Sequence, residues 1–571
     1  MARQWFLAGL VVLLLSVFIS ASTAASKAEQ AEPWWKSAVI YEIYPRSFAD
    51  GRNCGKGNLP GITARLDYLS DLGVDAIWIT PCYPSPQVDF GYDISDYCAI
   101  DPEFGTLSDF DNLVAEARKR HIRLIVDLVM NHTSDRHPWF IESASSKNNP
   151  RRSWYIWSDG KDGGPPNNWL SLFGHSAWRR DPLTGQYYYH FFYPEQPDLN
   201  WRNPEVRRAM YDVARFWLDR GVAGFRLDAI CTMFEDPRLL DNPLKPGTNK
   251  FGDPNMENRY NERQDEVHEV LKELRRVLDS YGDNRLLIGE TSEASVAKLF
   301  EMYGRNSDEI QLPMNFFFAF VPELSAREFR KQIAASDLNP ARGWPVYLLS
   351  NHDQVRHYDR YATGSDRDSV AKLMAAMLLT LRGTPILYYG EELGMETSPP
   401  TRKQDVRDPI GKLGWPLEKG RDGERTPMQW SDAPYAGFSA VKPWLPVAAN
   451  YKSHNVAVEQ QDPSSILNFY KKLIKLRRNN PAFGRGAYVP LNESDNHVLS
   501  YLRQDAGTGD SVLVALNMSR QTQHISFDLK RHGISEPEAT TLLSSDRHAP
   551  ASVLLNSLTL RPFAVYIAQV R

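Results

Sequence analysis

The chain has 571 residues, more than one hydrophobic core usually organises, so a large domain with at least one smaller domain is expected. Apolar residues make up 42% of the chain, which is typical of a globular protein and excludes a largely disordered one. The formal net charge is -4, with 66 Lys and Arg against 70 Asp and Glu, and this balance argues against a nucleic-acid partner because no broad basic field exists.

The N-terminus has the layout of a secretory signal peptide. Arg3 precedes an apolar run from Phe6 to Ile19, and a stretch of small residues from Ser20 to Ala25 follows. An uncleaved membrane anchor is the alternative, but a span needs about 20 apolar residues and this run is shorter. We therefore expect residues 1–25 to be removed and the mature protein to be secreted or periplasmic, with no membrane association after cleavage.

Export would permit disulfide bonds among the four cysteines, which are Cys54, Cys82, Cys98 and Cys231. Four cysteines allow three pairings, and these spacings match no zinc or redox motif. We expect one surface disulfide or buried free thiols, without a preferred pairing.

Short β-rich runs alternate with amphipathic stretches from Val39 onward, which predicts parallel strands in an α/β fold. The runs are Val39–Tyr44, Ala76–Ile79, Leu124–Val129, Gly224–Leu227, Leu286–Gly289, Val346–Leu349 and Ile386–Tyr389. One helix is predicted from the cap-type residue Asn203 to Gly221. Seven or eight such units, with no Gly-rich phosphate loop after the first run, favour a (β/α)₈ TIM barrel over a doubly wound sheet.

This rhythm stops after His132 and returns near Asn200, across a stretch dense in Trp, Asn, Pro and Gly. A long irregular insert after a barrel strand is usually functional, so we interpret residues 133–199 as a small domain over the active site. The barrel is then expected at 33–132 and 200–481, ending in a helix from about Ser464 to Arg478. Period-two runs after this helix predict an antiparallel β domain over 482–571.

Polar residues directly follow four of the predicted strands, where barrel enzymes place their catalytic groups. The four strand ends are DLVMNH (Asp127–His132), GFRLDA (Gly224–Ala229), IGE (Ile288–Glu290) and LSNHD (Leu349–Asp353). One polar strand end alone would indicate only the start of a solvated loop. Four in one chain predict an active site.

Arg226 and Asp228 are two residues apart on one strand, so their side chains share a face. A neighbouring cation favours an ionised carboxylate, which suits Asp228 to be a nucleophile. A purely structural Arg–Asp pair is the alternative. Glu290 supplies a second acid, and burial together with the negative charges of Asp228 and Asp353 is expected to hold its proton. Two carboxyl groups in opposed environments divide the roles of nucleophile and general acid.

The same strand ends resemble the ordered motifs of the α-amylase family, glycoside hydrolase family 13, from about Trp34 to the C-terminus. Three further motifs belong to this likeness, namely QPDLN (Gln196–Asn200), GYDISDY (Gly91–Tyr97) and GTPILYYGEE (Gly383–Glu392). QPDLN and RTPMQW (Arg425–Trp430) also resemble the branch of oligo-1,6-glucosidases, α-glucosidases, trehalose synthases and sucrose isomerases. The resemblance implies a catalytic barrel, an inserted domain B and a C-terminal β-sandwich domain C.

The resemblance implies that Asp228 is the nucleophile, Glu290 the acid/base and Asp353 the carboxylate that stabilises the transition state. It also implies a glucose pocket made by Asp89, Tyr92, His132, Phe173, Phe192, Gln196, Arg226, His352 and Arg421. As alternatives, Phe173 and Phe192 could belong to the core of domain B, and Arg421 could be a surface ion-pair partner. The implied reaction is double displacement with retention, for which the two carboxyl groups stand about 5–5.5 Å apart.

The loop Asp50–Asn58 bears on whether the protein binds calcium, and Ala229 bears on which glucosidic linkage it prefers. Relatives in this branch often have a calcium loop after the first strand, but here Asp50–Asn58 places Arg52 and Cys54 where oxygen ligands are needed. Calcium takes six to eight oxygens, so we predict no metal, and we expect no cofactor. Valine after the nucleophile accompanies α-1,6 specificity in this branch, so the smaller Ala229 predicts a preference for maltose and short α-1,4 gluco-oligosaccharides.

The main prediction is therefore an exo-acting retaining α-glucosidase with a small-molecule substrate. An oligo-1,6-glucosidase, a trehalose synthase and a sucrose isomerase remain alternatives, because sugar instead of water could capture the same intermediate. Export favours the hydrolase. A non-catalytic amylase-like ectodomain that escorts a transporter would need a full-length anchor and would tolerate loss of the carboxylates. An endo-acting amylase conflicts with the closed pocket implied by Asp89, Tyr92 and Arg421. The sequence gives no indication of oligomeric state.

Overall fold

The computed structural model describes residues 32–282, 284–337, 343–535 and 538–571. The predicted signal peptide lies outside these residues. Within them, no helix combines the length and the apolar character needed to cross a membrane.

Eight parallel strands form the central sheet, and they confirm the predicted (β/α)₈ barrel. The strands are β1 (Ile40–Ile43), β2 (Ala76–Ile79), β3 (Arg123–Val129), β7 (Gly224–Asp228), β10 (Leu286–Gly289), β11 (Leu312–Pro313), β12 (Val346–Leu348) and β13 (Thr384–Tyr388). Their order is β11-β10-β7-β3-β2-β1-β13-β12, with parallel pairing throughout. A parallel bridge between Met314 and Val346 brings the two edges together.

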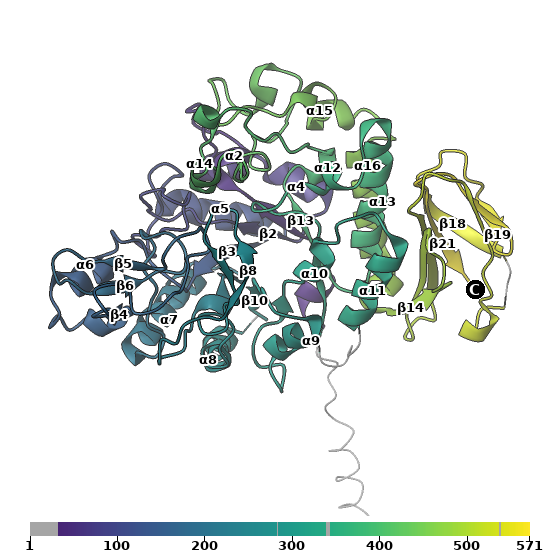
Figure 1. Ribbon diagram of the computed structural model, residues 1–571. Helices are drawn as coiled ribbons and strands as arrows, with labels where there is room; N and C mark the ends of the chain where they lie inside the picture. Colours follow the sequence, from purple (N-terminus) through teal and green to yellow (C-terminus); the bar gives the residue numbers. More distant parts are fainter. Residues whose placement is uncertain (1–31, 283, 338–342, 536–537) are drawn as a thin grey trace, which may run out of the picture.

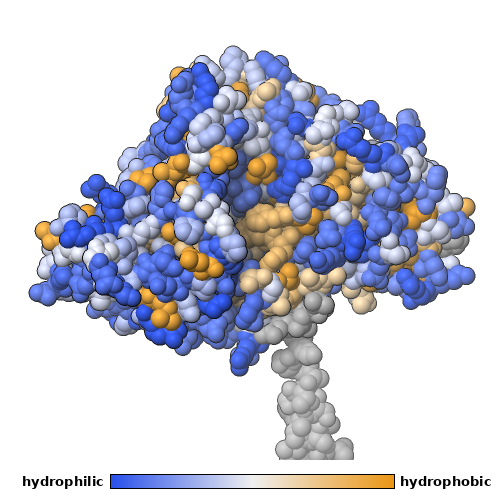
Figure 2. Space-filling model, in the orientation of Figure 1, coloured by the Kyte–Doolittle hydropathy of each residue, from blue (hydrophilic) through white to orange (hydrophobic). Residues whose placement is uncertain are grey.

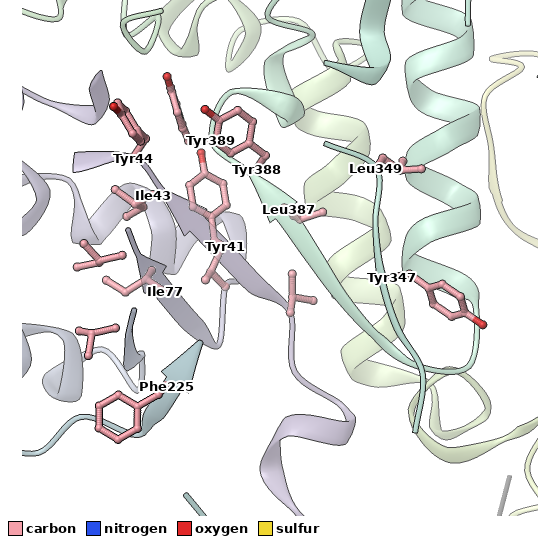
Figure 3. Packing of buried hydrophobic residues seen from close by; sticks show 14 of the residues in the cluster. Tyr41, Ile43, Tyr44, Ile77, Phe225, Tyr347, Leu349, Leu387, Tyr388 and Tyr389 are labelled. Atoms are coloured by element: carbon pink, nitrogen blue, oxygen red, sulfur yellow. The ribbon is translucent and has the colours of Figure 1, made fainter. Parts of the chain in front are cut away.

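Alternation along the strands separates an inner from an outer side of the barrel. Ile40, Ile125 and Ile288 belong to a buried cluster whose strand residues come from β1, β2, β3, β10, β11, β12 and β13. Residues on the outer side, such as Tyr41 on β1 and Phe225 on β7, belong to the larger cluster between strands and helices, part of which is shown in Figure 3. Apolar residues thus pack on both sides of the strands along most of their length, and polar residues lie at the C-terminal ends of the strands.

Helices surround the barrel. The longest are α5 (Leu107–Lys119), α7 (Pro204–Asp219), α8 (Val267–Asp279), α13 (Arg367–Thr380) and α16 (Ile466–Asn479). The Asn203 side chain accepts from the Glu205 amide and caps α7, with Pro204 in its first turn. Both the helix predicted from Asn203 and the long helix predicted near Ser464 are confirmed.

Two smaller sheets flank the barrel on opposite sides of the view in Figure 1. Strands β4 (Trp157–Ser158), β5 (Trp178–Arg180) and β6 (Tyr187–Tyr189) form a three-stranded antiparallel sheet between β3 and β7 in the chain, beside α6 (Pro138–Ser145). The C-terminal part forms a six-stranded antiparallel sheet in the order β14-β15-β16-β21-β18-β19. Its strands are β14 (Ala487–Leu491), β15 (Val498–Gln504), β16 (Ser511–Asn517), β18 (Glu538–Ser544), β19 (Ser552–Leu554) and β21 (Val565–Val570).

Candidate active site

The inner side of the barrel becomes polar at the C-terminal ends of its strands. Glu42 lies two residues after the inward-facing Ile40, and Asp127 two residues after Ile125. Arg226 and Asp228 occupy the same side of β7, whereas Phe225 and Leu227 pack outside with the helices. Figure 2 shows this face of the protein hollowed near its middle, where hydrophobic side chains border a hydrophilic recess.

Arg226 is fully buried and contacts three carboxyl groups, which together we call the Arg226 cluster. Its Nη1 lies 2.6 Å from Oδ1 of Asp127 and 2.7 Å from Oδ1 of Asp228, and its Nη2 lies 2.7 Å from Oε2 of Glu290. The Ala229 amide donates to the same Glu290 oxygen at 3.1 Å. One guanidinium thus holds the predicted nucleophile and the predicted acid/base on its two nitrogens.

The charges in the Arg226 cluster differ from the expectation that Arg226 keeps Asp228 ionised. Burial raises the pKa of Asp228 well above its ordinary value; Arg226 opposes this rise, and Glu290 and Asp127 add to it. Burial also raises the pKa of Asp127 to about 6, again against Arg226. The physical reason is that three carboxyl groups share a single cation, so its charge cannot compensate all of them.

Arg421 forms a second centre, the Arg421 cluster, from chain segments far apart in sequence. Its guanidinium lies 2.7 Å from Oδ1 of Asp89, 3.0 Å from Oδ1 of Asp353 and 2.8 Å from Oδ2 of Asp408. Arg425 adds a second cation 2.6 Å from Oδ1 of Asp353. With only 13% of its side chain exposed, Arg421 is not the surface ion-pair partner considered as an alternative.

Charge is better compensated in this second cluster. Burial alone would raise the pKa of Asp353, but the charged guanidinium groups of Arg421 and Arg425 lower it well below its ordinary value. Burial is also overcome at Asp408, whose pKa Arg421 lowers to about 2. These two carboxylates are therefore ionised at any pH at which the protein is expected to work.

Stacked rings connect the two clusters. The rings of Tyr92 and His352 stack at 5.4 Å with an angle of 8° between their planes, and the Tyr92 hydroxyl lies 2.7 Å from Nε2 of His352. Nε2 of His352 also lies 3.3 Å from Oδ2 of Asp353, and the Tyr92 hydroxyl accepts from Arg226 at 3.4 Å. Burial lowers the pKa of His352 well below its ordinary value, so this ring is a neutral hydrogen-bonding group.

The remaining predicted pocket residues join the Arg421 cluster. Gln196 reaches both Oδ2 of Asp89, at 3.3 Å, and Nε2 of His132, at 3.0 Å. The His132 ring lies 5.1 Å from the ring of Phe192. Burial lowers the pKa of His132 to about 3, which keeps it neutral.

Phe173 and Phe192 contact both the insert and the pocket. Phe173 packs with Tyr193 and Ile410, and the guanidinium of Arg421 lies 5.9 Å from its ring centre. Phe192 lies 5.7 Å from Phe173. The alternative that they only fill the core of the insert is thus incomplete, because each also contacts a polar pocket residue. All twelve predicted site residues are connected by such contacts.

Four residues of this network were not predicted as site residues: Glu42, Asp127, Asp408 and Arg425. Oε1 of Glu42 lies 2.6 Å from Nδ1 of His352 and fixes that ring from below. Asp127 and Arg425 begin the quoted motifs DLVMNH and RTPMQW, so a signal was present in the sequence. Glu42 could have been found from its place in an otherwise apolar strand. Asp408 lies in a loop and had no such signal.

Hydrogen bonds of Asp50 and Arg52 hold the loop that follows β1. Asp50 accepts from the amides of Gly55, at 2.7 Å, and Arg52, at 2.9 Å, and Arg52 in turn donates to Oδ2 of Asp109 at 3.1 Å. The Arg52 guanidinium therefore bridges this loop to α5, whereas the absence of calcium stays a prediction.

All four cysteines are free thiols, of which Cys82 and Cys231 are buried.

Comparisons with known proteins place the chain in a family. Residues 42–486 match the model of the α-amylase catalytic domain, and residues 489–567 match that of the maltogenic amylase C-terminal domain. A probable α-glucosidase of Rhizobium meliloti is 42% identical over 522 residues, which cover 89% of this chain and 94% of that protein. An oligo-1,6-glucosidase of Parageobacillus thermoglucosidasius is 40% identical and covers 94% of this chain and 99% of its own.

Solved structures agree with this assignment. The trehalulose synthase of Pseudomonas mesoacidophila superposes with a TM-score of 0.86 at 37% identity, covering 95% of this chain and 100% of its own. An α-glucosyl transfer enzyme has the same TM-score of 0.86 at 40% identity, with 94% and 100% covered. The chain is thus similar to proteins named as glucosidases, as an α-glucosyl transfer enzyme and as a trehalulose synthase.

Proposed function

The chain belongs to the α-amylase family of glycoside hydrolases, and from this premise we propose that it is an exo-acting retaining α-glucosidase. Its substrates would be maltose and short α-1,4-linked gluco-oligosaccharides, from which it would release α-glucose at the non-reducing end. The observation that carries the proposal is the Arg421 cluster. Arg421 joins Asp89, Asp353 and Asp408 across loops from three parts of the chain, an arrangement that suits a pocket for one terminal glucose better than a cleft for a long chain.

The Arg226 cluster supplies the groups for double displacement. With one cation facing three carboxyl groups, one proton is best retained among them. In this proposal Glu290 protonates the leaving oxygen while Asp228 attacks the anomeric carbon. Water activated by Glu290 then hydrolyses the β-glucosyl ester, and two inversions give net retention.

Asp353 is proposed to accept hydrogen bonds from glucose hydroxyls, and Arg425 and Arg421 hold it in its charged form for this role. A charged acceptor makes stronger hydrogen bonds than a neutral one. Neutral His132 and His352 would complete the recognition of hydroxyl groups, and Tyr92 would offer its ring to the sugar face.

Linkage is the finer part of the proposal, and Ala229 supports it. Ala229 has a φ of 46°, a conformation that is costly for a β-branched residue. The backbone at this position therefore suits alanine better than the valine that accompanies α-1,6 specificity. Relatives named oligo-1,6-glucosidase make that activity the second candidate.

Export is proposed on the N-terminal sequence alone, from the apolar run Phe6–Ile19 and the small residues after it. N-terminal sequencing of the protein from the culture fluid or periplasm checks this. A mature protein that begins near residues 24–26 is expected. Retention of the apolar run would contradict the proposal.

A product profile over maltose, isomaltose, sucrose and trehalose tests the function, with proton NMR of the first glucose released. We expect the highest kcat/KM on maltose and α-glucose as the initial product. Initial β-glucose would refute the retaining mechanism, and mainly isomerised disaccharide would indicate a synthase instead. Glu290→Gln, purified in parallel, controls for glucosidases of the host.

A further inference from the structure

A second cavity, with a volume of about 540 Å³, lies on the outer side of the Arg421 cluster. Val88 and Phe90 line it on either side of Asp89, and Arg407 and Pro409 line it on either side of Asp408. Asp89 and Asp408 themselves turn to Arg421 and are absent from the lining. The two aspartates thus separate this cavity from the predicted glucose pocket.

Positive charge dominates the cavity. Four of its lining residues are cations, namely Arg46, Lys56, Arg407 and Lys412, and none is an acid; we call it the cationic cavity. Its volume falls within the range of about 300–1,000 Å³ that is typical of small-ligand sites. Charge of one sign in a concave site attracts ligands of the opposite sign, even on a protein whose net charge is -4.

Two of these cations form no ion pair in the part of the chain that the structure describes. Arg46 and Lys56 both pair with Glu103. Arg407 and Lys412 are exposed and form no ion pair with a described residue. Asp405 is within range of Arg407, but it already pairs with Arg402 at 2.6 Å.

An aromatic surface accompanies the charges. The Trp444 ring is half-buried, lies 5.4 Å from the ring of Phe90 and is fixed by a hydrogen bond from its Nε1 to Oγ of Ser47 at 2.9 Å. A fixed indole ring beside a cavity can stack on the apolar face of a sugar ring at little entropic cost. Cations and a sugar-stacking ring together fit a ligand that has both an anionic group and a ring.

We propose that the cationic cavity binds a monosaccharide that carries a phosphate or a carboxylate. Its ring stacks on Trp444, and its anionic group lies between Arg407 and Lys412. Both anionic groups accept hydrogen bonds from Arg and Lys, and the experiment separates them.

The site is placed to influence the glucose pocket. Trp444 stacks on Tyr44 at 6.3 Å, Tyr44 stacks on His352 at 6.2 Å, and His352 stacks on Tyr92 of the pocket at 5.4 Å. A bound anion would also add negative charge behind Asp89, whose pKa burial already raises. Because a further rise weakens a charged acceptor for glucose, we expect a several-fold higher KM for maltose with the anion bound and little change in kcat.

Isothermal titration calorimetry on the full-length mature protein tests the binding without turnover. The probes are glucose 6-phosphate, glucuronic acid, inorganic phosphate and glucose. The double variant Arg407→Ala/Lys412→Ala is compared with Arg327→Ala/Lys331→Ala, which removes the same charges from exposed positions of α11 (Ala326–Asp337). We expect the first variant to bind the preferred anionic sugar at least about tenfold more weakly, and the second to bind it like the parent protein.

The calorimetry distinguishes the two anionic groups and can also overturn the site. Tighter binding of glucose 6-phosphate than of glucuronic acid identifies phosphate as the anionic group, and the reverse identifies a carboxylate. Inorganic phosphate that binds as tightly as the anionic sugars, with no loss in Trp444→Ala, overturns the part assigned to the ring. Equal binding by both double variants, or none by the parent protein, overturns the site. Since no turnover is measured, a negative result leaves the proposed glucosidase activity untouched.

Discussion

Two buried arginines, Arg226 and Arg421, each contact three carboxyl groups, yet their clusters have opposite electrostatic character. In the Arg226 cluster, burial raises the pKa of both Asp127 and Asp228. In the Arg421 cluster, the pKa of Asp353 and that of Asp408 lie below their ordinary values, although burial raises the pKa of Asp89. The difference arises because Arg425 adds a second cation beside Asp353.

The two clusters are suited to two different functions at the C-terminal end of the barrel, proton transfer and substrate binding. Proton transfer needs a group whose protonation changes near the working pH, and an excess of carboxyl groups over cations provides one. Binding of neutral sugar hydroxyls needs fixed charges that do not titrate, and a better-compensated cluster provides those. The ratio of cations to carboxyl groups therefore distinguishes the predicted reacting centre from the predicted binding wall.

The largest effect should come from removing an acid of the reacting centre. Asp228→Asn keeps the shape of the side chain but removes the nucleophile, so kcat on maltose should fall by about 10⁴-fold or more. Asp408→Asn, in the Arg421 cluster, should mainly raise KM, since the Asp408 side chain accepts its hydrogen bonds from Arg421 and from the Ile410 amide. Steady-state kinetics on both variants measure the contrast.

Thermal melts control for unfolding in these two variants. A loss of kcat in Asp408→Asn as large as that in Asp228→Asn, at an unchanged melting temperature, would remove the distinction between the clusters. Glu290→Gln sharpens the comparison, because activity on glucosides with good leaving groups needs less acid catalysis and should fall less than activity on maltose.

Arg421→Ala should have the next largest effect. It leaves Asp89, Asp353 and Asp408 with one cation less, and unpaired buried charges cost about 3–5 kcal/mol. We expect kcat/KM on maltose to fall by about 10²–10³-fold, along with a lower melting temperature. Arg421→Lys keeps the charge but cannot reach three carboxylates, so it should recover stability more than activity. Full activity in the alanine variant would show that Arg421 is not part of the glucose pocket.

The pH dependence of kcat/KM should follow the protonation of the Arg226 cluster and not that of the Arg421 cluster. A nucleophile must be ionised, and a raised pKa of Asp228 delays ionisation to higher pH. The acidic limb of kcat/KM should therefore lie above the ordinary aspartate pKa of about 3.9, with a loss of about tenfold per pH unit below it. A limb below pH 3.9 would contradict this assignment.

The free energy of unfolding should decrease only at a pH lower than that at which activity is lost. The depressed pKa of Asp353 and Asp408 contributes stability that is present above the ordinary aspartate pKa and is lost only as the pH falls through the folded-state values, about 2 for Asp408. The protein should thus stay folded across the acidic limb of activity. Circular dichroism recorded at each pH of the profile checks this.

The sequence was sufficient to predict most of the barrel, because apolar runs and cap residues are local signals. It failed at β11, where Leu312–Pro313 is only two residues long and contains a proline, which interrupts a strand pattern. The exposed hairpin of β8 (Leu244–Thr248) and β9 (Pro254–Met256) was also missed, since its strands contain glycine, proline and lysine and have no buried face.

For the site, residue identities were predictable but their electrostatics were not. Arg226 beside Asp228 is visible in the sequence, and it suggests a simple ion pair. That Asp127 and Glu290 share the same guanidinium depends on how β3, β7 and β10 lie beside one another in the barrel. The pKa of Asp228 follows from this crowding and from burial, which are properties of the tertiary structure.

The smallest expected effect concerns Ala229, which lies between the two predicted catalytic residues through its amide contact with Glu290. Ala229→Val adds two methyl groups at a φ of 46°, so it should shift the ratio of kcat/KM for isomaltose to that for maltose upward by about 10-fold, at a cost in stability of about 1–2 kcal/mol. Ala229→Gly is the control, because glycine adopts this φ without strain and adds no volume. If it shifts the ratio as Ala229→Val does, added side-chain volume is not the cause of the shift. If neither changes the ratio, linkage is decided elsewhere in the pocket, and the Arg226 cluster tolerates changes next to its nucleophile.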